Sequence, residues 1–76
     1  MNKEMFERML AEYQELVERT GKLIDFINDD KFNELDALNK DLCITQVKAM
    51  ETYLGVLSIR IGYNAPENNE IIEEEA

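Results

Sequence analysis

Apolar residues recur at helical spacing along two long stretches of the chain, one on each side of a short polar break at residues 28–35. In both stretches the steps between apolar positions alternate between 4 and 3. The first stretch contains Phe6, Leu10, Tyr13, Val17, Thr20, Ile24 and Ile27. The second contains Cys43, Val47, Met50, Leu54, Leu57 and Ile61. This periodicity predicts two amphipathic α-helices.

The two predicted helices cover about residues 3–28 and about residues 34–62. Asparagine and aspartate side chains between them compete for backbone donors and act as N-caps, so they end one helix and begin the next. Gly62 is expected to stop the second helix. Because a short connection makes neighbouring helices antiparallel, the predicted fold is all-α: residues 1–63 form an antiparallel helical hairpin, and residues 64–76 form a disordered acidic tail.

The position of the turn sets an approximate register between the helices. With the turn centred near Phe32, residues whose numbers sum to about 66 lie level. This register pairs Thr20 with Gln46, and it pairs Ala11 with Gly55. The second pair combines two small residues, so we expect a close approach of the backbones there.

The second stretch carries more apolar surface than one partner helix can cover. A further set of apolar positions consists of Leu42, Ala49, Val56 and Tyr63 at intervals of 7, with Ile44 and Ile59 further round. Exposed apolar surface on this scale usually marks an association site. Disulfides and a structural zinc site cannot supply stability, because the chain has one cysteine and no histidine. We therefore expect a homo-oligomeric helical bundle, most simply a dimer that closes as four antiparallel helices.

The net charge of −9 is concentrated at the C-terminal end. Five of the 17 acidic residues lie in the last 13 positions, which leaves 12 acidic against 8 basic residues in residues 1–63. An acidic surface argues against direct binding to nucleic acid or anionic lipid, since phosphate contacts need a basic face. No stretch approaches the roughly 20 apolar residues of a membrane span, and the N-terminus is too charged for a signal peptide. We expect a cytoplasmic protein.

The residue types argue against an enzyme. Cys43 is the one strong nucleophile, but a reactive thiolate needs a base or a positive environment, and the chain has no histidine. A small core residue is the interpretation that we favour for it. The sequence contains no Gly-rich phosphate loop and no metal-ligand spacing. We expect neither catalysis nor a cofactor.

Polar residues at intervals of 7 line one side of the second predicted helix. Gln46, Tyr53 and Arg60 form this series, and the register places them opposite Thr20, Tyr13 and Phe6. An arginine that grips a phosphate beside a tyrosine that stacks on a base is a combination suited to small nucleotides. The alternative is that these are flanking residues whose polar tips simply reach solvent. The candidate ligand-binding residues are Arg60, Tyr53, Gln46, Tyr13, Arg8, Arg19 and Lys22.

Residues 18–27 and 46–61 give the chain a resemblance to a known family. The pattern comprises Arg19, Lys22, Leu23, Phe26, Ile27, Gln46, Met50, Tyr53, Leu57, Arg60 and Ile61. In these positions the chain resembles a family of small helical proteins of unknown function encoded by crAss-like and many other tailed bacteriophages. The resemblance covers most of residues 6–62. It implies a phage accessory protein in the host bacterial cytoplasm, and it brings no established active site.

Three functions are compatible with these observations. The first is a small phage protein that acts stoichiometrically against host defence by sequestering a nucleotide-type immune signal in pockets between subunits. The alternative is a protein-binding inhibitor or adaptor that occupies a host protein through its apolar edge or acidic surface. The third is a purely structural or assembly role, which only oligomerisation supports.

Overall fold

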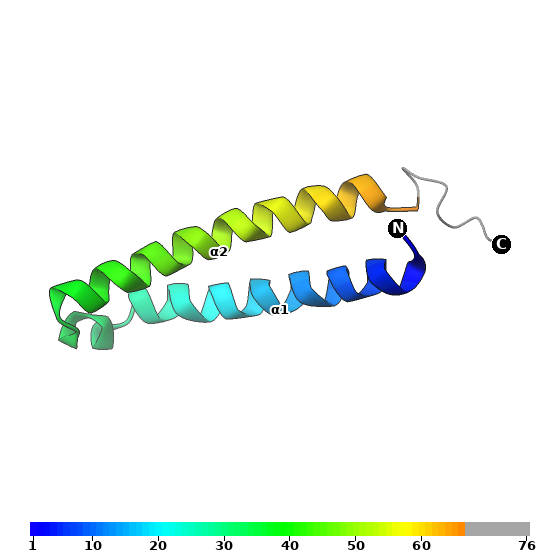
Figure 1. Cartoon of the computed structure of the whole chain (residues 1–76). Coiled ribbons are helices and arrows are strands. Elements are labelled where there is room, and N and C mark those ends of the chain that lie inside the picture. Colours follow the sequence, from blue (N-terminus) through cyan, green and yellow to red (C-terminus); the bar gives the residue numbers. More distant parts are fainter. Residues whose placement is uncertain (67–76) are drawn as a thin grey trace.

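The protein is a helical hairpin in a computed structural model, of which residues 1–66 are described (Figure 1). It consists of α1 (Lys3–Ile27), a short 3-10 helix η1 (Asp30–Glu34) and α2 (Ala37–Asn64). The two long helices run antiparallel side by side, and the hairpin measures 56 × 15 × 15 Å. Most of the predicted acidic tail, residues 67–76, lies outside the described residues.

The helix boundaries follow from capping side chains. The Asn2 side chain accepts a hydrogen bond of 2.8 Å from the Met5 amide at the start of α1. At the start of α2, the Asp36 carboxylate accepts one of 2.8 Å from the Asn39 amide. Each bond satisfies a backbone donor that the first turn of a helix leaves unpaired. Because Asp36 is the N-cap and residues 30–34 form the 3-10 helix, α2 begins three residues later than the sequence predicted.

The C-terminal end of α2 also differs from the prediction. The helix passes through Gly62 and ends at Asn64, whose side-chain amide donates a 2.8 Å hydrogen bond to the Arg60 carbonyl. Gly62 does not adopt the left-handed conformation of a glycine stop. Pro66 supplies the stop instead, because a proline pushes the preceding residue, Ala65, into an extended conformation. The C-terminal end of α2 therefore lies two residues further along the chain than expected.

The core lies between the helices and contains Met9, Leu16 and Leu57, the last with no exposed surface. Five further side chains pack against it: Phe6, Tyr13, Met50, Leu54 and Ile61. On α2 the buried or half-buried apolar residues are those that the periodicity predicted. On α1 the buried stripe is rotated, because Met9 and Leu16 are buried while Val17 is 45% exposed.

The predicted close approach at Gly55 is wrong. A Cβ atom added to Gly55 would meet nothing within 4 Å, so this residue does not lie against α1. The turn end of the hairpin is closed by aromatic packing instead. Phe26 and Phe32 make an edge-to-face contact with ring centroids 6.1 Å apart, and the Lys40 ammonium lies 6.0 Å from the Phe32 ring centre.

Candidate functional site

The three residues of the predicted series lie along one side of α2. Gln46, Tyr53 and Arg60 are all exposed, and we call this set the Tyr53 edge. They share a side because residues seven apart on an α-helix are about two turns apart. Within residues 1–66, the Arg60 guanidinium makes no ion pair. The edge thus offers a phenol, an amide and an uncompensated positive charge to solvent.

Tyr53 connects this edge to α1. Its hydroxyl donates a hydrogen bond to the carboxylate of Glu12, and this contact fits the predicted register within one residue. The bond raises the pKa of Tyr53, because ionising the phenol would break it. Desolvation and the Glu12 charge act in the same direction, and the charge of Arg60 opposes them. Tyr53 therefore remains a neutral hydrogen-bonding group at physiological pH.

Two candidate arginines lie on α1 in exposed ion pairs. Arg8 binds Glu4 with a nitrogen–oxygen distance of 2.8 Å, and Arg19 lies 3.7 Å from Glu15. Both side chains in each pair are about three-quarters exposed, so water screens the attraction and each pair contributes little. A phosphate could exchange for either carboxylate at small cost. Lys22 is exposed too, and among the described residues it makes no ion pair.

The aromatic and hydroxyl residues of α1 that were expected opposite the Tyr53 edge lie in or against the core instead. Phe6 and Tyr13 pack against the core, so they support the hairpin more than they line an edge. Thr20 is buried, and its hydroxyl donates a 2.6 Å hydrogen bond to the Leu16 carbonyl within the same helix. The residue of α1 that meets the Tyr53 edge is Glu12, which sequence reasoning missed. The register could have identified Glu12, because it makes residues whose numbers sum to about 66 level and therefore places Glu12 close to Tyr53.

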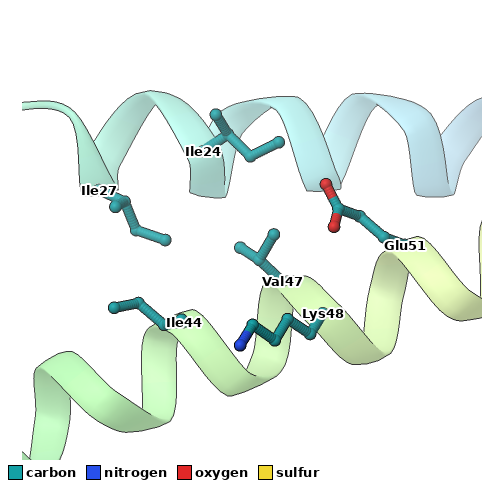
Figure 2. Close-up of a pocket in the computed structure, with 6 residues that line it drawn as sticks. All are labelled: Ile24, Ile27, Ile44, Val47, Lys48 and Glu51. Atoms are coloured by element: carbon teal, nitrogen blue, oxygen red, sulfur yellow. The ribbon is translucent and has the colours of Figure 1, made fainter.

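A second surface feature lies between α1 and α2, away from the Tyr53 edge. An open hollow of about 310 Å³ lies between the helices near the turn, and Figure 2 shows the side chains that line it. Its lining is Ile24, Ile27, Ile44, Val47, Lys48 and Glu51. None of the predicted ligand-binding residues lines it. Because four of the six lining residues are aliphatic and the two charged ones, Lys48 and Glu51, have opposite signs, the hollow suits an apolar group better than a phosphate.

Groups that support metal or thiol chemistry do not assemble in the part of the chain that is described. Residues 1–66 contain no cluster of three or more cysteine, aspartate or glutamate side chains placed to hold a metal ion. Cys43 is a free, half-buried thiol in the stripe that faces α1. Within the same range, no helix is long and apolar enough to span a membrane.

These features define a small all-helical hairpin protein with an exposed edge of arginine, tyrosine and glutamine. The chain belongs to the Sequestin family, because the model of that family matches residues 3–63. This range includes both stretches that resemble small phage proteins. No curated protein and no solved structure matches the chain.

Proposed function

We propose that this protein is a phage accessory protein that acts stoichiometrically against host defence by sequestering a nucleotide-type immune signal between its subunits. The observation that carries the proposal is the Tyr53 edge, on which Gln46, Tyr53 and Arg60 are exposed together. The family name points to a sequestering role, and the resemblance to phage proteins points to the biological setting.

The chemistry of the edge suits a phosphorylated aromatic ligand. The guanidinium of Arg60 offers paired donors to a phosphate, and the ring of Tyr53 offers a face for a base. Gln46 supplies both a donor and an acceptor for the base edge. Arg19 is nearly level with Gln46 in the register, so it adds a second positive charge from α1. These side chains bind and orient the ligand. Sequestration requires no further chemistry from them.

A thermal-shift screen against cyclic dinucleotides and ADP-ribose derivatives tests the proposal. A ligand that binds the folded state alone raises the unfolding temperature in proportion to the logarithm of its concentration. We expect at least one phosphorylated nucleotide to stabilise the protein, and we expect it to be recovered unchanged after heat denaturation of the complex. The absence of any stabilisation at millimolar ligand would contradict the proposal.

Variants of the edge make the screen specific. We expect Arg60→Gln to weaken binding roughly 10- to 100-fold, which is the effect of losing one charge-assisted hydrogen bond. Lys31→Gln removes the same charge from the exposed 3-10 helix at the far end of the hairpin, so it should leave binding unchanged. Equal losses in both variants would mean that overall charge, and no particular site, attracts the ligand.

A second candidate function rests on the exposed apolar side chains of α2. Leu42, Val56 and Tyr63 are exposed large apolar residues, and such a surface suits a protein partner as well as a second copy. In this alternative the protein is an inhibitor or adaptor that occupies a host protein. Capture of one stoichiometric host protein that is lost on charge reversal of surface glutamates, together with no nucleotide binding, would favour it.

A further inference from the structure

The side of α2 that faces away from α1 carries a second heptad series, which we call the outer seam. It consists of Leu38, Leu42, Thr45, Ala49, Thr52, Val56, Ile59 and Tyr63. All eight are exposed and none is charged, with Ile59 and Tyr63 more than 70% exposed. At about 100° per residue, the outer seam lies about 150° around the helix from the buried stripe. Steps that alternate between 4 and 3 over the whole helix are the pattern of a helix that pairs with another helix.

The order of side-chain sizes in the outer seam reads nearly the same in both directions. Large residues stand at each end, and small or hydroxyl residues stand at the centre. In an antiparallel pair of α2 helices, Leu38 would meet Tyr63 and Leu42 would meet Ile59 of the other copy. Ala49 would meet Thr52 at the centre, where small side chains let the backbones come close. The same surface is therefore complementary to itself about a two-fold axis.

Charge favours this antiparallel direction. The outer seam itself contains no charged residue, so pairing buries no unpaired charge. Residues 67–76, which begin three positions after the end of α2 in the sequence, contain five glutamates. A parallel pair would bring both sets of glutamates to one end and align the two helix dipoles, and both effects oppose association. An antiparallel pair separates the glutamates and opposes the dipoles.

The size of the outer seam suits a reversible dimer. From Leu38 to Tyr63 it is about 38 Å long at 1.5 Å per residue, and a helix with its side chains is about 11 Å wide. Two copies would cover on the order of 800 Å² together, and flanking residues raise this toward the roughly 1,000 Å² of a specific interface. We expect dissociation in the micromolar range.

We propose that a second copy of this chain covers the outer seam in antiparallel orientation, and that this pairing brings the two Tyr53 edges together on one side of the dimer. The edges meet because the two-fold axis is perpendicular to both helices. Rotation about this axis therefore places the partner's Tyr53 edge on the same face of the dimer. Gln46 then lies nearly level with the partner's Tyr53, and Tyr53 with the partner's Gln46. The buried stripe and the outer seam are less than 180° apart on this side, so the joined edges form the floor of a shallow groove.

The role of this groove as a ligand site rests on the proposed function. The groove adds to that function a place for the ligand between two copies of the chain. Each monomer supplies one phenol and one amide at the centre, so the monomer holds only half of the site. Arg19 of each α1 lies near the level of Gln46 and flanks the groove. A ligand with a flat base and one or more phosphates would stack between the two Tyr53 rings and reach an arginine. The pairing itself stands on the outer seam and needs no ligand.

Sedimentation velocity of two matched variants tests the pairing. Val56 in the outer seam is 48% exposed and Val17 on α1 is 45% exposed, so valine to glutamate adds the same charge at equally exposed positions. We expect the unaltered protein and Val17→Glu to sediment as dimers at 100 µM, and Val56→Glu to sediment as a monomer. A monomeric unaltered protein, or a Val56→Glu variant as dimeric as Val17→Glu, would overturn the proposal.

A pair of cysteine variants tests the antiparallel direction of the pairing. This test remains valid even if the Val56→Glu variant unfolds and loses its helical circular dichroism. In a Cys43→Ala background, Leu38→Cys and Tyr63→Cys are prepared separately and then mixed under mild oxidation. We expect a disulfide between the two different variants and little within either one alone. Efficient self-linking of Leu38→Cys would show a parallel pair and overturn the shared groove.

Ligand binding then separates this inference from the proposed function. Dimers without any nucleotide binding would leave the pairing intact and contradict the sequestering role. Nucleotide binding by monomeric Val56→Glu with unchanged affinity would support the role and overturn the shared groove. We expect Val56→Glu to weaken binding at least 10-fold and Val17→Glu to leave it unchanged.

Discussion

Tyr53 is the residue whose environment is most informative, because it joins the two helices through an exposed polar contact. Its phenol donates to Glu12 on α1 while its ring stays accessible at the edge of α2. The side chain is thus held in place by one end and remains open to a ligand on its face. A tyrosine that is already oriented loses less conformational entropy when a base stacks on it.

Titration of Tyr53 is the first prediction at the residue scale. Because the pKa of Tyr53 in the folded protein is raised by its bond to Glu12, this bond contributes its full stabilisation below about pH 10, the ordinary value for tyrosine. The contribution disappears as the pH rises through the raised pKa. The difference in tyrosinate absorbance between the unaltered protein and Tyr53→Phe isolates this phenol. We expect Glu12→Gln to lower its pKa, and an unchanged pKa in that variant would contradict the contact.

Truncation of Leu57 is the second prediction at this scale. Leu57 has no exposed surface, so Leu57→Ala removes buried methyl groups and leaves a cavity between the helices. We expect it to lower the free energy of unfolding by about 2–5 kcal/mol in urea denaturation. Met5→Ala shortens an exposed side chain on α1 and should change it by less than about 0.5 kcal/mol. Similar losses in both variants would argue against a core centred on Leu57.

At the scale of the elements, the two helices use their apolar residues differently. On α1 they form one broad face, and packing selects Met9 and Leu16 from it as the buried residues. On α2 they form two separate stripes, one that faces α1 and one, the outer seam, that faces solvent. A helix that is apolar on two sides is typical of the interior of an assembly. The difference identifies α2 as the helix at the centre of the proposed dimer.

Gly21 provides the prediction at this scale. It lies in the interior of α1, where a helical glycine costs about 1 kcal/mol relative to alanine, and a Cβ atom there would meet nothing within 4 Å. We therefore expect Gly21→Ala to raise the free energy of unfolding by about 1 kcal/mol. Ala11→Gly, at an exposed position of the same helix, should lower it by a similar amount. Destabilisation by Gly21→Ala would reveal a close neighbour, such as a second copy, at this position.

At the scale of the whole molecule, the hairpin is elongated. Its radius of gyration is 17.0 Å, whereas a compact globule of 76 residues has one of about 11 Å. Two helices form one layer of contact, and a single layer can bury only one stripe on each of them. A large part of the apolar surface is consequently exposed in the single hairpin.

Small-angle X-ray scattering over a concentration series distinguishes the ways in which two hairpins can pair. Pairing along the outer seam places the copies side by side, so the mass should double while the longest dimension of the helical part stays near 56 Å. End-to-end association would instead nearly double that dimension. We expect the Val56→Glu variant to show the cross-section of one hairpin at every concentration, and a doubled length in the unaltered protein would contradict the seam.

Two aspects of this protein were determined by the sequence alone. The periodicity of apolar residues and the polar break at residues 28–35 predicted two packed helices, since helical spacing and capping act within a few residues of the chain. The heptad spacing likewise placed Gln46, Tyr53 and Arg60 on one side of α2. Each of these inferences depends on local geometry only.

The tertiary structure decided which surfaces face each other. The broad apolar face of α1 contained two equally periodic stripes, and only contact with α2 selected the one through Met9 and Leu16. Contact also left Val17 exposed, although the spacing had placed it in the stripe, and it brought Glu12 to Tyr53. Helix rotation about its own axis leaves local hydrogen bonds unchanged, so the choice between neighbouring stripes belongs to packing between helices and cannot be read from either helix alone.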